Sequence, residues 1–142
     1  MKRGELVYTL EEIDDVGLFL YNQLLDYPIM AFTGTLGAGK TTLVQAILRT
    51  AGIDEAIPSP TFAYVHSYAN HVGYTFHHFD LYRLTNARQF IEHGFLDYLT
   101  EPQAYTLIEW PELITSLLPK RTAWVALDSM HEGQRRVRYE LV

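Results

Sequence analysis

Hydrophobic and polar residues follow two different rhythms along the chain, and each rhythm predicts a kind of element. Apolar residues recur at helical spacing through residues 13–24, and Thr9 with Glu12 forms a capping box just before them. We therefore expect a helix that ends at about Asp26. A short apolar stretch ahead of it, residues 6–8, is a strand candidate.

The next apolar stretch, residues 29–33, has no polar alternation, as is typical of a central strand with both faces covered. A glycine-rich loop, residues 34–39, separates it from an amphipathic segment, residues 40–51. We expect that segment to be a helix that stops at Gly52. Strand, glycine loop and helix in this order indicate an α/β fold.

The second half of the chain carries shorter apolar runs. Residues 62–68 alternate, and residues 72–79 follow after a turn, which predicts a β-hairpin. The pattern further predicts helical turns at 86–92 and 95–99, a buried strand at 105–108, a short helix after Pro111, and strands at 123–127 and 137–142 joined at 131–133. The hairpin and the final strand pair favour a mixed parallel and antiparallel sheet.

Composition narrows the class of protein. The chain has 142 residues, of which 48% are hydrophobic and 20% charged, with a net charge of −6 and no cysteine. This length fits one domain, residues 1–142, and the acidic charge disfavours non-specific binding to nucleic-acid backbones. The lack of cysteine excludes disulfides, thiolate zinc sites and cysteine nucleophiles. Neither a secretory signal nor a long apolar run stands out, so we expect a cytoplasmic protein without a membrane segment.

Residues 34–41 read GTLGAGKT, which fits the phosphate-loop pattern G-x-x-x-x-G-K-[ST] between a strand and a helix. Glycines let the backbone turn tightly and point N–H groups at an anion, and the helix N-terminus adds partial positive charge. Lys40 can reach the β- and γ-phosphates, and the Thr41 hydroxyl can bind Mg²⁺. The residues expected to contact the nucleotide here are Gly34, Gly37, Ala38, Gly39, Lys40, Thr41 and Thr42.

A nucleotide site of this kind also needs an acid at a strand end, to hold magnesium or to orient water. Two positions compete for that role. Glu109 follows the apolar strand at 105–108, and Asp80 ends the second strand of the hairpin. We expect Glu109 to contact Mg²⁺ directly or through water, and Asp80 to polarise water or complete the metal shell. The alternative for either is a surface acid or a helix cap.

Four stretches of the chain together resemble one known family. They are Leu36–Thr42 in the phosphate loop, Ser59–Phe62 (SPTF), His78–Leu84 (HFDLYRL) and the pair Glu109 and Trp110. In this order and spacing, the set resembles the TsaE (YjeE) family of bacterial ATPases of tRNA threonylcarbamoyladenosine synthesis. The similarity runs from about Thr9 to Leu127. Many enzymes share the phosphate loop, whereas the other stretches are far more specific.

The resemblance implies a fold, a reaction and partners. The fold is a P-loop NTPase-like three-layer α/β sandwich with a mixed sheet, and the cofactors are ATP and Mg²⁺. The family acts with the TsaD–TsaB heterodimer, which transfers threonylcarbamoyl to adenosine 37 of tRNA. ATP hydrolysis by the small protein supports repeated turnover of that heterodimer, so contact with tRNA is only indirect.

The resemblance also implies roles for individual residues. Lys40, Asp80 and Glu109 are implied to serve catalysis, and Thr41 with Glu109 to hold the metal. A switch-like segment near the γ-phosphate is implied at Ser59–Phe62. The residues implied to border the nucleotide outside the loop are Glu11, Asp80, Trp110 and Gly133.

Two positions depart from the family pattern. Thr35 stands where the family commonly has an acid, and Gln45 with Ala46 stands where an Arg-Gly pair is common. Neither position supplies the phosphate-binding N–H groups, the lysine or the threonine. The departures therefore concern partner contacts or rate more than nucleotide binding.

Basic side chains leave several interpretations open. Arg83 is either an arginine finger for the γ-phosphate or the ion-pair partner of a nearby acid. Arg136 and Arg138 share one face of a strand and Arg135 does not, and a partner-facing or solvated edge is favoured over tRNA binding at this net charge. The adjacent histidines 77–78 face opposite sides of their strand and cannot easily bind one ion.

The residues thus favour an ATP-hydrolysing domain that is slow alone, because no glutamine is placed to position water and positioning supplies much of this catalysis. A small-molecule kinase with the same loop is the second reading, although no arginine-rich lid follows Glu109. The third is a non-hydrolysing, nucleotide-sensing adaptor in which ATP only orders the segment Ser59–Phe62.

Overall fold

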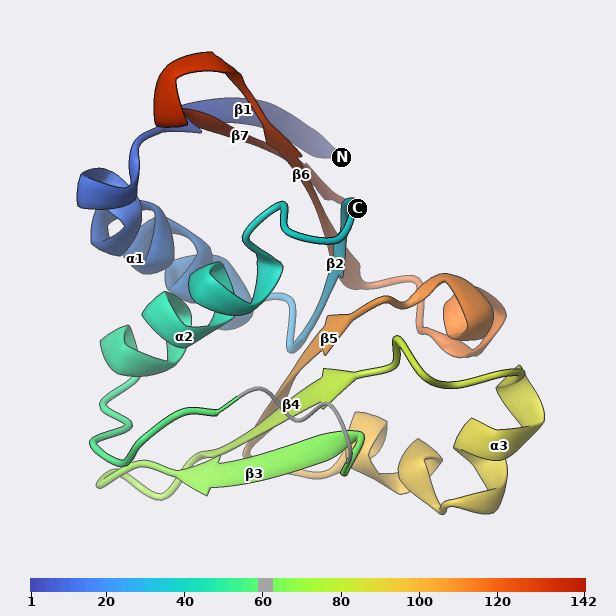
Figure 1. Cartoon of the computed structure of the whole chain (residues 1–142). Helices are drawn as coiled ribbons and strands as arrows, with labels where there is room; N and C mark the ends of the chain where they lie inside the picture. The colour runs from blue at the N-terminus through green and yellow to red at the C-terminus, as the bar shows by residue number, and fades with distance from the viewer. Residues whose placement is uncertain (59–62) are drawn as a thin grey trace.

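A computed structural model describes residues 1–58 and 63–142. The segment Ser59–Phe62, for which the resemblance implies a switch, lies outside the described residues. Within the described parts, the strands form one mixed sheet with helices on both faces (Figure 1). This arrangement confirms the α/β three-layer fold.

The sheet combines a parallel centre with antiparallel sides. Its strands are β1 (Lys2–Tyr8), β2 (Ile29–Thr33), β3 (Val65–Ala69), β4 (Thr75–Asp80), β5 (Ala104–Glu109), β6 (Thr122–Ser129) and β7 (Arg135–Leu141). Their order is β1-β7-β6-β2-β5-β4-β3. The inner strands β6, β2, β5 and β4 run parallel, and β1, β7 and β3 run antiparallel to their neighbours. The predicted hairpin and final strand pair are therefore confirmed.

The helical elements cover the two faces of the sheet. They are η1 (Leu10–Glu12), α1 (Ile13–Leu24), α2 (Lys40–Thr50), α3 (Ala87–Glu92), η2 (Phe95–Thr100), η3 (Glu112–Leu117) and η4 (His131–Gly133). Helices α1 and α2 lie side by side on one face, and α3 lies on the other (Figure 1). Among the described residues, no helix is long and apolar enough to cross a membrane.

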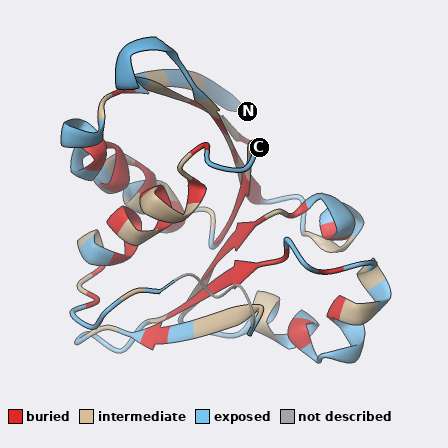
Figure 2. Cartoon of the chain, in the orientation of Figure 1, coloured by how far each residue is buried: buried red, intermediate tan, exposed pale blue. Residues whose placement is uncertain are grey.

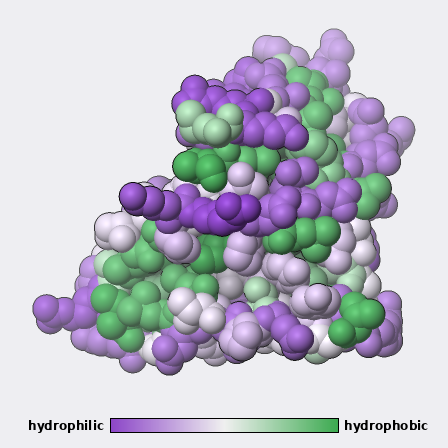
Figure 3. Space-filling view, turned by 180° about the vertical axis from the view of Figure 1, so that it is seen from behind, coloured by the Kyte–Doolittle hydropathy of each residue, from purple (hydrophilic) through white to green (hydrophobic). Residues whose placement is uncertain are grey.

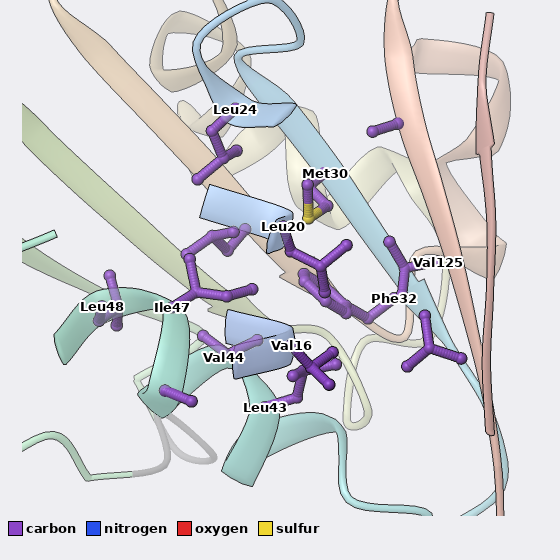
Figure 4. Close-up of a cluster of buried hydrophobic side chains, with 14 of the residues drawn as sticks. Val16, Leu20, Leu24, Met30, Phe32, Leu43, Val44, Ile47, Leu48 and Val125 are labelled. Atoms are coloured by element: carbon purple, nitrogen blue, oxygen red, sulfur yellow. The ribbon is translucent and has the colours of Figure 1, made fainter. Parts of the chain in front are cut away.

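Strand β2 separates two hydrophobic cores, because successive strand residues point to opposite faces. Met30 and Phe32 point toward α1 and α2, where they pack among apolar side chains of both helices (Figure 4). Ile29 belongs to the second core, together with Phe79 and the aromatic residues of α3 and η2. Both faces of β2 are thus covered, which is why this segment reads as an uninterrupted apolar run.

Helices α1 and α2 approach closely at Gly17. A Cβ atom added to Gly17 would lie 3.0 Å from the backbone carbon of Ala46 and 3.1 Å from its Cβ. The small residue in α2 and the glycine in α1 therefore allow the two backbones to meet. The neighbouring Gln45 donates from Nε2 to the carbonyl of Ile57 at 2.7 Å. Both residues that depart from the family pattern in α2 have packing roles.

Element boundaries differ from the expectation in a few places. The capping-box carboxylate of Glu12 accepts the N–H of Thr9 at 2.9 Å, but the first turn after it is η1, a 3-10 turn, and α1 begins at Ile13. The first hairpin strand begins at Val65, because Tyr64 has a φ of 64°, outside the strand region. The second begins at Thr75 and ends at Asp80.

Burial concentrates in the inner strands, whereas the turn between β6 and β7 is exposed (Figure 2). Seen from behind, the surface interleaves hydrophilic and hydrophobic residues (Figure 3). Among the described residues, the buried acidic, basic and imidazole side chains are those of Lys40, His77, His78, Asp80 and Glu109. Four of them, all except His77, lie close together. Burying such groups is costly unless they are paired, so this cluster marks a place where chemistry rather than packing has set the sequence.

Candidate functional site

The phosphate loop lies between β2 and α2, at the carboxyl ends of the parallel strands. This is the edge where open α/β sheets bind ligands. Gly39 has a φ of 100°, a left-handed conformation that favours glycine, and it directly precedes the first residue of α2. At Gly34, an added Cβ would come within 2.7 Å of the carbonyl oxygen of Leu127. Gly39 is therefore required by its backbone conformation, and Gly34 by the close approach of the Leu127 backbone.

Lys40 opens α2 and is 5% exposed. Its ammonium donates to the carbonyl of Gly34 and, at 3.0 Å, to that of Thr35, and it lies 3.9 Å from the centre of the Trp110 ring. Burial lowers the pKa of Lys40, and the carboxylates of Glu109, Glu112 and Asp80 oppose that shift, Glu109 most strongly. The lysine is thus held inside the loop by oxygens that phosphate oxygens can replace.

Glu109 ends β5 and links two other elements. Its Oε1 accepts the hydroxyl of Thr41 at 2.7 Å, and its Oε2 lies 2.6 Å from Nε2 of His78. The side chains of His78 and Glu109 are 0% and 3% exposed. A carboxylate held at both oxygens has a fixed orientation, so Glu109 is positioned before any ligand arrives.

Asp80 lies directly beside Glu109, because β4 and β5 are parallel and pair in register at these two residues. Asp80 accepts the N–H of Tyr82 at 3.0 Å, which fixes the turn that follows β4. Both carboxylates therefore face the phosphate loop from adjacent strand ends. The expectation that each acid stands at a strand end is confirmed.

Trp110 follows Glu109 with a φ of 59°, a conformation that costs a non-glycine residue about 1–3 kcal/mol. Its ring lies 5.0 Å from that of Tyr82, centre to centre, and beneath the ammonium of Lys40. The chain thus accepts backbone strain that places an aromatic ring next to the loop lysine.

These residues line a cleft of about 400 Å³. Its lining residues are Leu36, Gly37, Gly39, Lys40, Thr41, Thr42, Asp80, Tyr82, Arg83, Glu109, Trp110 and Arg135. Among the expected site residues, Gly34 and Ala38 shape the loop without lining the cleft. Glu11 and Gly133 do not line it either. They lie in η1 and η4, close in sequence to the pair Tyr8 and Arg135, and their contact with a nucleotide stays a prediction.

A larger groove, of about 610 Å³, lies over β1, β7 and β6, with Trp124 and Arg138 in its wall. It contains no residue of the phosphate loop. Size alone would point to this groove, but the buried charges and the glycine loop meet in the smaller cleft. We therefore place the functional site at the loop.

The donor set of the cleft fits Mg²⁺. Magnesium prefers oxygen ligands and takes only one or two from protein when phosphates and waters supply the rest. Neighbouring ligands of an octahedral ion with bonds of about 2.1 Å stand about 3 Å apart. The 2.7 Å between the Thr41 hydroxyl and Glu109 Oε1 is close to that spacing. The described residues hold no group of three or more His, Cys, Asp or Glu side chains that would make a separate metal centre.

Several residues of the site were not assigned to it from the sequence, among them Arg135, which lines the cleft, and His78, which contacts Glu109 without lining it. The sequence predicts for His78 only that it faces the side opposite to His77, and it predicts a partner-facing or solvated edge for the arginine cluster that contains Arg135. The expectation that His77 and His78 face opposite sides is confirmed, because His77 lies between Ser67, at 2.7 Å, and Glu101, at 2.8 Å, on the other face. The spacing of His78 and Asp80 could have indicated this role for His78. The two residues are two positions apart on one strand, so their side chains point to the same face of the sheet.

Comparisons with known proteins agree with this geometry. The family described as "Threonylcarbamoyl adenosine biosynthesis protein TsaE" matches residues 7–137. The chain belongs to the TsaE family.

Several curated TsaE proteins are similar to this chain, each named "tRNA threonylcarbamoyladenosine biosynthesis protein TsaE". The protein of Treponema pallidum is 33% identical over 109 residues, which cover 77% of this chain and 78% of that protein. That of Haemophilus influenzae is 39% identical over 67% of this chain and 59% of its own length. That of Rickettsia felis is 34% identical over 88% of this chain and 72% of its own length.

The fold is shared with a solved structure as well. The crystal structure of YdiB from Bacillus subtilis superposes with a TM-score of 0.77, over 99% of this chain and 86% of that one. The two sequences are 22% identical, so this similarity concerns the fold alone. The mixed sheet flanked by helices therefore also occurs in an independently solved structure.

Proposed function

We propose that this TsaE family member binds ATP with Mg²⁺, hydrolyses the ATP slowly, and supports threonylcarbamoylation of adenosine 37 in tRNA by acting on the TsaD–TsaB heterodimer. One observation carries the nucleotide part. The loop lysine, the Thr41 hydroxyl and two buried strand-end carboxylates converge on one cleft. Membership of the family and the names of its curated relatives support the tRNA part.

In this proposal, different residues of the cleft bind the phosphates, hold the metal ion and orient the attacking water. The loop N–H groups and Lys40 bind the β- and γ-phosphates, which replace the carbonyl oxygens of Gly34 and Thr35 around the ammonium. Thr41 and Glu109 hold Mg²⁺, which when bound neutralises charge that develops on the phosphate oxygens. Asp80, facing the same space, orients the attacking water. His78 keeps Glu109 in place.

The same cleft explains why hydrolysis alone should be slow. Phosphoryl transfer depends on positioning of the nucleophile and on compensation of charge. The part of the chain that the structure describes places no glutamine among the residues that line the cleft. A partner that completes the water-positioning geometry would accelerate the reaction, which fits an ATPase whose turnover depends on the TsaD–TsaB heterodimer.

The nucleotide site is tested by calorimetry with ATP and Mg²⁺ and by phosphate release. Lys40→Ala should weaken ATP binding by about 10- to 100-fold, because one charged hydrogen-bond donor to phosphate is lost. The exposed Lys120 provides a matched control, and Lys120→Ala should bind as the wild type does. Equal affinity of Lys40→Ala and the wild type would refute the site.

Catalysis is tested with Glu109→Gln, which keeps the shape of the side chain and removes its charge. We expect ATP binding to persist and hydrolysis to fall by about 10²- to 10⁴-fold, because the ion that compensates charge on the phosphate oxygens would be held less well and such compensation lowers the barrier by several kcal/mol. Glu92→Gln, at the exposed end of α3, is the control. Full phosphate release by Glu109→Gln would remove this residue from the mechanism.

The partner is tested by measuring ATP hydrolysis and modified-tRNA yield with and without the TsaD–TsaB heterodimer. Faster hydrolysis and a higher yield on its addition support the proposal. Turnover that requires a small acceptor molecule instead would identify a kinase. Nucleotide binding without phosphate release, even with the heterodimer present, would identify a nucleotide-sensing adaptor.

A further inference from the structure

Arg135 comes from the far end of the chain to the phosphate loop. It is the first residue of β7, which runs antiparallel to β6, so it lies at the carboxyl ends of the parallel strands. In the sheet it is paired with Ser129 on one side and Tyr8 on the other. The terminal strand pair thus adds a cation to the edge where the nucleotide cleft opens.

The guanidinium of Arg135 occupies space that only a glycine leaves free. A Cβ atom added to Gly39 would lie 1.8 Å from Arg135 Nη1 and 3.3 Å from its Cδ. Arg135 also lines the cleft together with Lys40 and Thr42. The loop and this side chain are therefore fitted to one another, and the guanidinium stands against the loop at the residue before Lys40.

One end of that guanidinium is buried and unsatisfied. Among the residues that the structure describes, Nη1 of Arg135 has no hydrogen-bond partner, and neither has the hydroxyl of Tyr8, the residue paired with it. A buried donor without a partner costs about 1–3 kcal/mol, and more when it is charged. Such a cost persists in a folded chain when a ligand supplies the missing acceptor.

The neighbouring arginines show how different this environment is. Arg136 and Arg138 point to the opposite face of β7, where both donate to Asp128 at 3.0 Å. The two guanidinium groups thus share one carboxylate as their ion-pair partner. Because successive residues of a strand point to opposite faces, Arg136 and Arg138 take part in ion pairs at the surface, whereas Arg135 lies at the loop.

The charge of the cleft complements a polyphosphate. Lys40, Arg83 and Arg135 supply three cationic side chains to its lining, against the two carboxylates Asp80 and Glu109. A guanidinium presents N–H donors in a planar fork that matches two phosphate oxygens, which makes arginine well suited to phosphate recognition. The ligand that this surplus of donors selects is an anion with several phosphate oxygens.

We propose that Arg135 binds the phosphates of the nucleotide, as a second cation in addition to Lys40, from its position against the loop residue Gly39. The inference rests on the proposed ATP site and adds to it a phosphate-binding residue from the C-terminal strand pair. A phosphate oxygen would supply the acceptor that Nη1 lacks, and the pairing of β7 with β6 is what places this arginine beside the loop.

The experiment compares Arg135→Gln with Arg136→Gln by calorimetry, with ATP, pyrophosphate and adenosine as probes. Arg135→Gln should weaken ATP and pyrophosphate binding by about 10- to 100-fold, and adenosine binding should not change. Arg136→Gln, on the other face, should bind all three as the wild type does. Arg135→Lys, which keeps the charge, should recover part of the loss. The salt dependence of ATP binding should also weaken in Arg135→Gln, because one phosphate contact is gone.

The outcomes separate this inference from the proposed function. Wild-type chain that binds ATP, with Arg135→Gln binding it equally well, overturns the role of Arg135 and leaves the ATP site standing. A loss confined to adenosine shows that Arg135 contacts the base and also overturns the inference. Equal losses in Arg135→Gln and Arg136→Gln show a general effect of charge or stability. Wild-type chain that binds neither ATP nor pyrophosphate refutes the ATP site itself.

Discussion

The contact between His78 and Glu109 gives the sharpest test of how this site is held together. The Nε2···Oε2 distance is 2.6 Å and both side chains are almost fully buried. A hydrogen bond to a charged group contributes about 1.5–3 kcal/mol to stability. Replacing His78 by Phe keeps a ring of similar size in the core and removes the donor to the carboxylate.

The change in stability caused by His78→Phe alone would underestimate the contribution of the hydrogen bond. Nδ1 of His78 is buried with no partner among the described residues, so His78→Phe also removes an unsatisfied polar atom, which offsets part of the loss. A double-mutant cycle with Glu109→Gln separates the two effects. Loss of the unsatisfied Nδ1 changes stability equally whether position 109 is Glu or Gln, so it cancels when the two effects of His78→Phe are subtracted. We expect a coupling energy of about 1.5–3 kcal/mol between the two positions.

The assay is urea denaturation of the wild type, both single variants and the double variant. In thermal scans, an unfolding entropy of about 2.1 cal/mol/K per residue over 142 residues makes 1 kcal/mol worth roughly 3 °C. The coupling should therefore correspond to roughly 5–10 °C in Tm. Additive effects, within about 0.5 kcal/mol, would refute the reasoning that His78 holds Glu109.

Two further predictions concern the loop lysine and the contact of α1 with α2. Since burial lowers the pKa of Lys40 below its usual 10.5, the unfolded chain binds more protons between the two pKa values, and this residue's contribution to stability rises with pH in that window. Urea denaturation of the wild type and of Lys40→Met at a series of alkaline pH values measures this effect. The free energy of unfolding of the wild type should rise relative to that of Lys40→Met as the pH rises. A difference between the two that does not change with pH would contradict the prediction. Gly17→Leu should destabilise the fold by about 1–3 kcal/mol, because its Cβ alone already meets Ala46 at 3.0 Å. Asn22→Leu, which introduces the same side chain at an exposed position of the same helix, is the control, and equal midpoints for the two variants would argue against close packing at Gly17.

Local sequence predicted the parts of the fold that depend on local rules. The run at residues 29–33 identified the central strand, because only a strand covered on both faces is apolar throughout. The glycine spacing identified the phosphate loop, since the loop's backbone geometry demands glycine at Gly34 and Gly39. Even the separation of Arg135 from Arg136 followed from strand parity alone.

What the sequence could not supply was the pairing between distant strands. That His78 meets Glu109 depends on β4 lying parallel to β5 in one register, which brings residues 31 positions apart into contact. The link from Arg135 to Gly39 requires β7 to fold back along β6. The positive φ of Trp110 is likewise set by its surroundings, because nothing in the residue itself favours that conformation.

The pairing of β1 with β7 has a consequence for how the chain is made. Lys2 pairs with Leu141 and Tyr8 with Arg135, so β1 is synthesised roughly 130 residues before the strand that pairs with it. At synthesis rates of about 5–20 residues per second, that delay is roughly 7–26 s. During this time β1 presents unpaired backbone groups on both edges, the condition in which nascent strands recruit chaperones or aggregate. The pairing of β7 with β1 thus protects one edge of a strand that is made long before it.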